Sequence, residues 1–223
     1  MTYIHLENIE FYYSPEKIIF KNISLQLKSG EFTVMMGLNG CGKTTLGKLM
    51  VGILQPVLGH IYIGGQGIEK YNLSQIGIRI GYLFQNPEQQ LFTTTVEEEL
   101  AFPMRFRGEE KSKIITETDK MLELFMLTKY RHQSPWNLSR GEKKRLAMAS
   151  ILINRPKYLI LDEPNSGLDT ISKNNLKNIF KKLKEQGIGI LLITHDSKFI
   201  EKEIDQLITV KGGQLIAQHR NKN

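Results

Sequence analysis

Short apolar runs separated by polar turns divide the chain into strands and helices. Residues 158–161 and 190–193 are uninterrupted apolar runs, the pattern of parallel strands that are buried on both faces. Residues 23–27 alternate apolar and polar side chains, as a half-buried strand does. Further strands are expected at residues 4–11, 32–36, 60–63, 80–84, 205–210 and 214–217. Strands of both kinds, interleaved with helices, indicate an α/β fold with a mixed sheet.

Helical periodicity is clearest in the second half of the chain. Apolar residues at positions 176, 179, 180 and 183 form one helix face, and Gly187 is expected to end that helix. Another helix is expected to begin at Ser139 as its N-cap. Residues 96–102 begin a helix that Pro103 should end or kink. Residues 111–127 carry apolar side chains at helical spacing and predict a further helix. We therefore expect one domain over residues 1–223, with a helical subdomain inserted at about 96–135.

The composition suits a folded domain in a reducing compartment. Of the 223 residues, 40% are hydrophobic, which is enough for a core, and a single cysteine excludes an internal disulfide. No run approaches the roughly 18 apolar residues of a transmembrane helix, and the first residues do not resemble a signal peptide. The net charge of +7 permits an anionic partner. However, the lysines of residues 173–184 are spread as on a solvated helix face, so a nucleic acid partner is not favoured.

A glycine-rich motif joins the strand at residues 32–36 to a helix that is expected from residue 44 to about 53. Residues 37–44 read G-x-x-x-x-G-K-T, the phosphate-binding P-loop. Its backbone N–H groups and the helix N-terminus attract an anion. The motif predicts that Lys43 reaches the β- and γ-phosphates of ATP and that the Thr44 hydroxyl holds Mg²⁺. Nucleotide contacts are expected from Asn39, Gly40, Cys41, Gly42, Lys43, Thr44 and Thr45.

Polar side chains follow three of the predicted strands. These side chains are expected to surround the phosphates, because ligands lie at the carboxyl ends of parallel strands. Asp162 is suited to hold Mg²⁺ through water, and Glu163 to polarise an attacking water as the general base. His195 is expected to contact the γ-phosphate, and Gln85 to reach the metal or the water. Alone, these residues could be an ordinary acidic loop and a structural histidine, but the P-loop favours catalysis.

The segment Leu138-Ser139-Arg140-Gly141-Glu142 completes a set of motifs. The other members are the P-loop, Gln85, Leu-Ile-Leu-Asp-Glu-Pro at residues 159–164, Ser-Gly-Leu-Asp at residues 166–169, and His195. In this order, the set resembles an ATP-binding cassette (ABC) ATPase subunit and covers nearly the whole chain. The resemblance implies a P-loop NTPase fold with an N-terminal antiparallel β subdomain and an inserted helical subdomain. It also implies an enzyme that couples ATP hydrolysis to transport.

The same resemblance implies that two cassettes pair head to tail, as a homodimer or a heterodimer. Each ATP would lie between the P-loop of one subunit and the signature segment of the other. The Ser139 hydroxyl and the Gly141 N–H would then bind the partner's γ-phosphate from a helix N-terminus. Asp169 would lie at the seam between the subunits and help couple the two sites. Tyr13 would stack on adenine.

The signature segment departs from the family's commonest form, Leu-Ser-Gly-Gly-Gln. Arg140 replaces the first glycine and could add positive charge near the nucleotide. Glu142 replaces the glutamine and could repel the nucleotide. A regulatory cassette with a weakened site is therefore one alternative function. A soluble cassette that acts on nucleic acid or ribosomes is another, although such proteins usually carry two cassettes or a long coiled-coil insert, and neither occurs in these 223 residues.

Residues 84–92, Phe-Gln-Asn-Pro-Glu-Gln-Gln-Leu-Phe, resemble a stretch of the energy-coupling factor (ECF) ATPases, whose importers take up vitamins and cobalt or nickel ions. The alternative is a generic loop. The resemblance implies a transmembrane coupling subunit and a substrate-binding membrane subunit as partners. It also implies a peripheral location at the cytoplasmic face of the cell membrane. ECF ATPases usually have a longer C-terminal extension that helps them dimerise, whereas the last predicted hairpin is followed here by only a few residues, up to Asn223. Without such an extension, we expect a monomer in the absence of ATP.

Overall fold

Two β-sheets organise the computed structural model of the protein, which describes residues 1–196 and 204–219. The strands of the larger sheet are β3 (Phe32–Gly37), β6 (Ile80–Leu83), β7 (Tyr158–Asp162), β8 (Gly189–Ile193), β9 (Gln206–Lys211) and β10 (Gln214–His219). Their order is β10-β9-β3-β8-β7-β6, and all neighbours except β9 and β10 pair in parallel. The smaller sheet is antiparallel and contains β1 (Thr2–Tyr12), β2 (Ile18–Lys28), β4 (Leu58–Ile63) and β5 (Gln66–Gly67).

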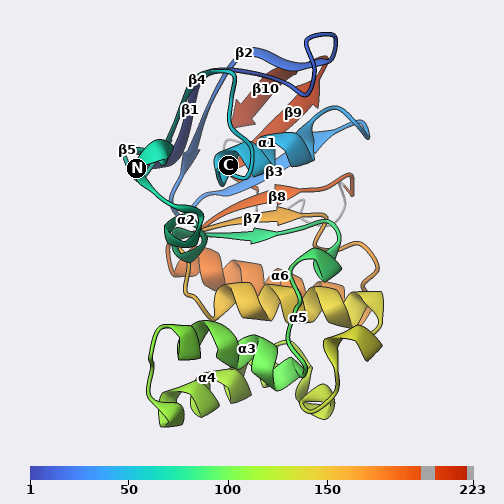
Figure 1. Ribbon diagram of the computed structural model, residues 1–223. Helices are drawn as coiled ribbons and strands as arrows, with labels where there is room; N and C mark the ends of the chain where they lie inside the picture. The colour runs from blue at the N-terminus through green and yellow to red at the C-terminus, as the bar shows by residue number, and fades with distance from the viewer. Residues whose placement is uncertain (197–203, 220–223) are drawn as a thin grey trace.

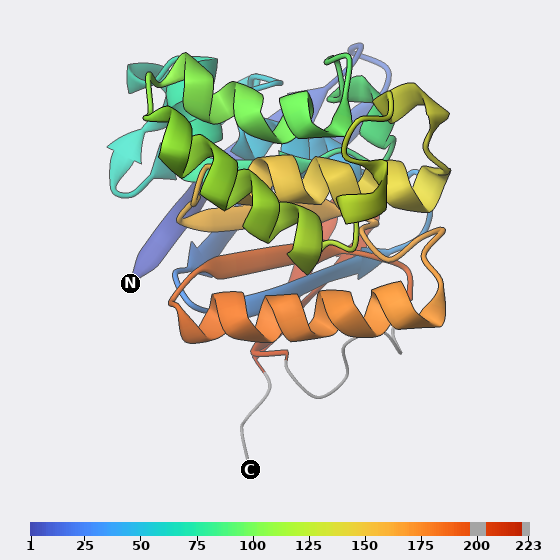
Figure 2. The same cartoon turned by 90° about the horizontal axis from the view of Figure 1, so that it is seen from below.

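Helices pack on both faces of the larger sheet (Figure 1). They are α1 (Lys43–Met50), α2 (Leu73–Arg79), α3 (Val96–Phe106), α4 (Lys111–Leu124), α5 (Arg140–Leu152) and α6 (Thr170–Glu185), with short 3₁₀ turns η1 (Ile68–Lys70), η2 (Pro87–Gln89), η3 (Thr128–Tyr130) and η4 (Pro135–Asn137). Helix α1 lies between the sheets, α5 and α6 cover the opposite face of the larger sheet, and α3 and α4 lie outermost (Figures 1 and 2). None of the helices in the described residues has the length and apolarity needed to cross a bilayer.

The pleat of the central strands sends alternate side chains into two separate cores. In β8, Ile190 and Leu192 belong to the core that contains α5 and α6. Leu191 and Ile193 face the other core, with α1 and the smaller sheet. Every residue of β7 and of β8 is consequently buried. Burial on both faces is the reason that these segments are continuous apolar runs in the sequence.

Most predicted elements are confirmed. The apolar runs are β7 and β8, the final hairpin is β9 and β10, and the helix that was expected to end at Gly187 is α6. Strand β2 is longer than the predicted residues 23–27, because its pairing with the 11-residue β1 continues as far as Ile18. Helix α2 was not predicted, since only Ile76 of its seven residues is buried and so short a helix shows no apolar period.

Helix α3 does not end at Pro103 but continues to Phe106. A proline inside a helix removes one backbone donor, which weakens the helix without forbidding it. The turn beyond Pro103 persists because Met104 is buried in the core that α3 shares with α5. Helices α3 and α4 together occupy much of the segment, about residues 96–135, that was expected to be helical.

Strand β8 begins with glycine because an aromatic ring on β7 needs the space. A Cβ atom on Gly189 would lie 2.2 Å from Cε2 of the fully buried Tyr158 and 2.8 Å from the carbonyl oxygen of Lys28. Tyr158 also stacks on Tyr3, with 5.9 Å between ring centroids. The ring therefore has contacts on both sides, and a larger residue at position 189 would overpack the core.

We expect Gly189→Ala to lower the free energy of unfolding by about 1–3 kcal/mol, the usual cost of overpacking. Gly77→Ala is the matched control, because Gly77 is exposed on α2 and a Cβ atom there meets nothing within 4 Å. The control should be neutral or stabilising by up to about 1 kcal/mol. Urea unfolding followed by circular dichroism measures both, and equal stability of the two variants would contradict the packing argument.

Candidate functional site

The loop between β3 and α1 forms a cradle in front of the helix. Gly42 precedes α1 with a left-handed φ of 104°, and a Cβ atom there would lie 2.7 Å from the Phe20 ring. Only glycine fits both conditions. Lys43 folds back over the loop, and its Nζ donates to the carbonyl oxygens of Gly37 (2.8 Å) and Leu38 (2.9 Å). An ammonium group beside a helix N-terminus makes this loop a cradle suited to phosphate.

The remaining P-loop residues extend the cradle toward Tyr13. Asn39 and Gly40 are exposed, and Cys41 is half-buried with its Sγ 3.8 Å from Lys43 Nζ. The buried Thr45 shares a hydrogen bond of 3.1 Å with the Tyr13 hydroxyl. Tyr13 is 58% exposed. An exposed aromatic ring beside the P-loop helix offers a stacking surface, so the geometry is compatible with the predicted adenine contact.

Thr44 and Asp162 meet across the edge of the larger sheet. Thr44 Oγ1 donates to Asp162 Oδ2 over 2.6 Å. Burial raises the pKa of the Asp162 carboxyl, and the Thr44 hydrogen bond offsets part of that rise. Hydroxyl and carboxylate oxygens are ligands that Mg²⁺ prefers, together with the phosphates of a nucleotide. A cation here would favour the ionised carboxylate, so the two residues fit the predicted metal position.

Glu163 and His195 are paired at the ends of β7 and β8. His195 Nδ1 lies 2.6 Å from Glu163 Oε1, which also accepts the backbone N–H of His195 over 3.0 Å. Thr194 Oγ1 donates to Glu163 Oε2 over 3.4 Å. Glu163 has a left-handed φ of 53°, a conformation that is uncommon outside glycine and is often found at functional sites. The structure therefore brings these two predicted residues together and fixes the carboxylate between neighbouring strand ends.

Gln85 lies two residues beyond the end of β6, apart from these pairs. Its side chain is exposed, and no side-chain hydrogen bond joins it to the other site residues within the part of the chain that the structure describes. It borders a polar cleft of about 430 Å³ together with Glu88 and with Arg140 and Lys143 of α5. The predicted contact of Gln85 with metal or water stays a prediction.

Ser139 caps helix α5, as the sequence indicated. Its hydroxyl accepts the N–H of Glu142 over 3.4 Å and donates to Oε2 of the same residue over 2.8 Å. Burial disfavours the ionised form of Glu142, yet hydrogen bonds from Tyr130 and Ser139 hold its pKa below the usual range. The Glu142 carboxylate turns back onto Ser139, and its lowered pKa favours the charged form, so the expected repulsion of a nucleotide stays a prediction. Gly141 is required for packing, since a Cβ atom there would lie 2.9 Å from the carbonyl oxygen of Gly167.

Asp169 caps helix α6. Its Oδ1 accepts the backbone N–H of Ser172 over 2.7 Å, and this hydrogen bond is the main reason that the pKa of Asp169 is lowered. Helix capping therefore explains the presence of an aspartate here without a partner subunit. The predicted position of Asp169 at a subunit seam stays a prediction.

Lys144 is a buried residue of the site that the sequence analysis missed. Its Nζ donates to the carbonyl oxygens of Glu163 (2.6 Å) and Ser166 (3.0 Å) and to Ser166 Oγ (2.6 Å). Burial lowers the pKa of Lys144 to about 8. A sequence signal existed, because apolar residues follow Lys144 at i+3, i+4 and i+7 and place it on the buried face of α5.

Comparisons with known proteins point to one family. A sequence profile of ABC transporters matches residues 20–166. A relative from Pyrococcus horikoshii, "Putative ABC transporter ATP-binding protein PH0132", is 36% identical over 212 residues, which are 95% of this chain and 81% of that protein. A "Putative ABC transporter ATP-binding protein" from Methanosarcina acetivorans is also 36% identical, over 96% of this chain, which spans 35% of that longer protein.

Two solved structures share the fold. CbiO1 from Clostridium perfringens, described as part of the ABC transporter complex cbiONQ, is 30% identical with a TM-score of 0.85 over 98% of this chain and 89% of its own. The ATP-binding cassette MJ0796, solved as a dimer in a post-hydrolysis state with ADP and Pi, is 25% identical with a TM-score of 0.88 over 98% of this chain and 100% of its own. The chain therefore belongs to the ABC transporter family and is an ATP-binding, ATP-hydrolysing cassette of a transporter.

Proposed function

We propose that this cassette is the motor subunit of an ECF-type importer for a vitamin or a transition-metal ion. The observation that supports its catalytic role most is the meeting of the Thr44–Asp162 and Glu163–His195 pairs at one sheet edge. The ECF type is supported by residues 84–92 and by the similarity to CbiO1, described as part of the complex cbiONQ. Residues of about 96–135 would form its helical subdomain.

The side chains at the sheet edge divide the work of hydrolysis among them. Thr44 and Asp162 would hold Mg²⁺, which neutralises phosphate charge when ATP is bound. Lys43 would bind the β- and γ-phosphates. Glu163 would accept a proton from the water that attacks the γ-phosphorus, as the bond to the ADP oxygen breaks. His195 would keep Nδ1 on Glu163 and turn its other ring nitrogen to the γ-phosphate.

Other residues of the site would complete nucleotide binding. Gln85 would turn toward the metal or the attacking water. Tyr13 would stack on adenine while its hydroxyl stays beside Thr45. The P-loop precedes α1 on one face of the larger sheet, and Ser139 begins α5 on the other face (Figure 1). The signature helix would therefore bind the phosphate of a nucleotide held by a second subunit. The dimeric structure of MJ0796 supports the pairing of two cassettes. We propose that this pair is head to tail, with Asp169 at its seam.

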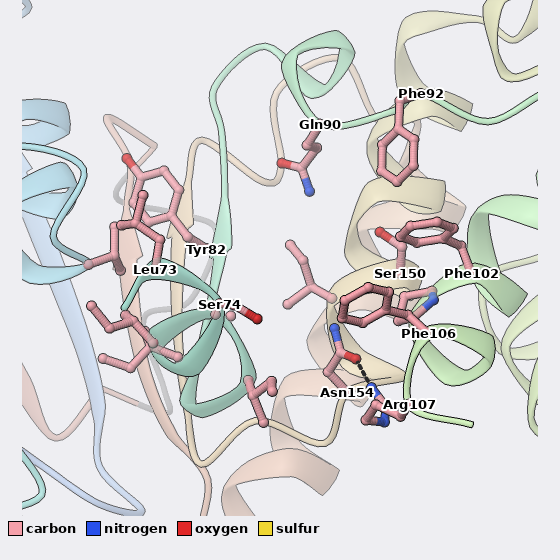
Figure 3. A pocket seen from close by; sticks show the side chains of 18 of the residues that line it. Leu73, Ser74, Tyr82, Gln90, Phe92, Phe102, Phe106, Arg107, Ser150 and Asn154 are labelled. Atoms are coloured by element: carbon pink, nitrogen blue, oxygen red, sulfur yellow. Dashed lines mark hydrogen bonds between the residues drawn. The ribbon is translucent and has the colours of Figure 1, made fainter. Parts of the chain in front are cut away.

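An apolar groove of about 720 Å³ lies among α2, α3 and α5 (Figure 3). Three phenylalanines form one wall: Phe102 contacts the rings of Phe92 and Phe106, with centroid distances of 4.9 and 6.2 Å. Phe92 is 62% exposed and Phe106 is 79% exposed. At one end, Arg107 donates a hydrogen bond to Asn154 (Figure 3). Exposed apolar side chains gathered around a groove are typical of a protein-binding surface.

We infer that a short amphipathic helix of the transmembrane coupling subunit occupies this groove, and that a substrate-binding membrane subunit completes the complex. Such helices insert apolar side chains into grooves of this kind. Membership of CbiO1 in a multi-subunit transporter complex supports a partner of this class. Phe92 and Gln90 of the groove follow Gln85 closely in the chain, so docking would be linked to the ATP site. The chain would then lie peripherally at the cytoplasmic face of the membrane.

Replacement of the proposed general base should separate ATP binding from hydrolysis. We expect Glu163→Gln to lower the ATP turnover at least about 100-fold, because an amide cannot accept the proton. ATP binding should persist, and ATP should now trap a stable dimer. Phosphate release and size-exclusion chromatography with ATP measure the two effects. Glu185→Gln, at an exposed position of α6, is the control, and normal turnover in Glu163→Gln would remove Glu163 from its proposed role.

A charge in the apolar groove should detach the cassette from its membrane partner. We expect Phe106→Glu to lower the fraction of the chain recovered with cell membranes at least about tenfold, since an aromatic anchor would be lost. ATP hydrolysis by the purified chain should remain, because Phe106 is the last residue of α3 and makes no hydrogen bond or ion pair with the residues proposed to bind ATP within the described part of the chain. Leu58→Glu is the control, because Leu58 is also exposed (60%) but lies on β4. Membrane recovery of Phe106→Glu equal to that of the control would exclude the groove as the docking site.

A further inference from the structure

Three consecutive residues near the start of helix α5 reach three different segments. Successive side chains on a helix point about 100° apart, so neighbours in sequence contact different surroundings. Glu142 binds back to Ser139 in the signature segment. Lys143 reaches Glu88, and Lys144 reaches the backbone of Glu163. The helix that carries the signature is thus attached to the segments that follow Gln85 and Asp162 in its own chain.

Lys143 makes the link to the segment of Gln85. Its Nζ lies 2.6 Å from Oε1 of Glu88 and 5.7 Å from the centre of the Trp136 ring. The Lys143 side chain is 11% exposed and that of Glu88 is 47% exposed. Two residues of different segments are therefore joined at a half-buried ion pair, on the border of the polar cleft that Gln85 also lines.

The segment between Gln85 and Glu88 is short and well supported. Asn86 caps the turn η2, accepting the N–H of Glu88 over 3.2 Å, and Pro87 is buried. A movement of Gln85 would consequently carry Glu88 with it. Contacts of α5 with η2 add to the ion pair. Through these contacts, a displacement of Gln85 would be transmitted to the start of α5.

Lys144 fixes the other side of the helix. It is fully buried, and its three hydrogen bonds go to Glu163 and Ser166, on the loop beyond β7. A buried ammonium group that lost these acceptors would be unpaired, which is costly. The start of α5 is therefore constrained to move with the loop of the proposed general base.

We propose that Lys143 and Glu88 are positioning residues that couple the two ATP sites of the dimer. In each chain, the pair would make the signature helix, which serves the partner's ATP, follow the Gln85 segment, which serves the chain's own ATP. The inference rests on the proposed head-to-tail dimer. Each chain would present Ser139 and Gly141 in the closing geometry only when its own Gln85 segment is in place.

A purely stabilising role of this ion pair is disfavoured by its surroundings. Ion pairs with an exposed partner contribute little to folding, because solvent screens them. Reversal of both charges should keep the attraction while each single reversal creates repulsion. A charge-reversal cycle therefore tests the link without removing a core side chain.

The test uses the Glu163→Gln chain as the parent, because ATP should trap its dimer. Glu88→Lys, Lys143→Glu and the double reversal are added to it, and sedimentation with saturating ATP gives the concentration at half dimerisation. We expect each single reversal to raise that concentration about tenfold and the double reversal to restore it to within about threefold, a coupling of ordinary size. The Kd for ATP of the monomer should stay within about twofold of the parent, since the P-loop is untouched.

The control reverses the exposed pair Arg105 and Glu98, which are also 2.6 Å apart but lie on α3. Its dimerisation should match the parent. If the parent dimerises and the single reversals at Glu88 and Lys143 dimerise equally well, or if the double reversal is as weak as the singles, the coupling role is overturned. If the parent does not dimerise with ATP at all, the head-to-tail dimer fails, and this inference fails with it.

Discussion

The whole site depends on the parallel pairing of β3, β8, β7 and β6. Because these strands run in one direction, the segments that follow them leave the sheet at the same edge. The P-loop, the Asp162–Glu163 pair and His195 are distant in sequence but become neighbours there. Strands β7 and β8 are buried on both faces, so packing in two cores holds them in register. The positions of the residues at this edge are fixed as a result.

The second constraint is electrostatic. Lys43 and Lys144 are both buried, and the oxygens that accept their closest hydrogen bonds are backbone carbonyls and one serine hydroxyl. Asp162 is buried against a threonine, and burial raises its pKa. Burial disfavours the ionised forms of these side chains, which are held mainly by hydrogen bonds with neutral groups. A bound group of opposite charge would therefore stabilise their ionised forms. The edge is therefore arranged so that a nucleotide with its cation improves the charge balance of the protein.

Helix α5 connects this edge of the sheet with the signature segment, which is proposed to face a second subunit. Its first turn carries the signature residues, whereas Lys143 and Lys144 attach to the two segments that would lie beside the chain's own nucleotide. Gly141 shows how close this packing is, because a single methyl group there would meet the carbonyl of Gly167. The signature of one chain and the proposed hydrolytic residues of the same chain are thus parts of one packed unit. That arrangement suits a motor in which two subunits must act together.

The sequence by itself determined the buried strands, the P-loop and the polar residues at the strand ends, because each leaves a local pattern of apolar runs, glycines or turn residues. Motif order was enough to indicate the ABC family, which the comparisons confirmed. Only the tertiary structure decided that α3 continues past Pro103 and that Lys143 and Lys144 attach to other segments. These features depend on which segments pack together, and contacts between residues distant in the chain leave no periodic signal in the sequence.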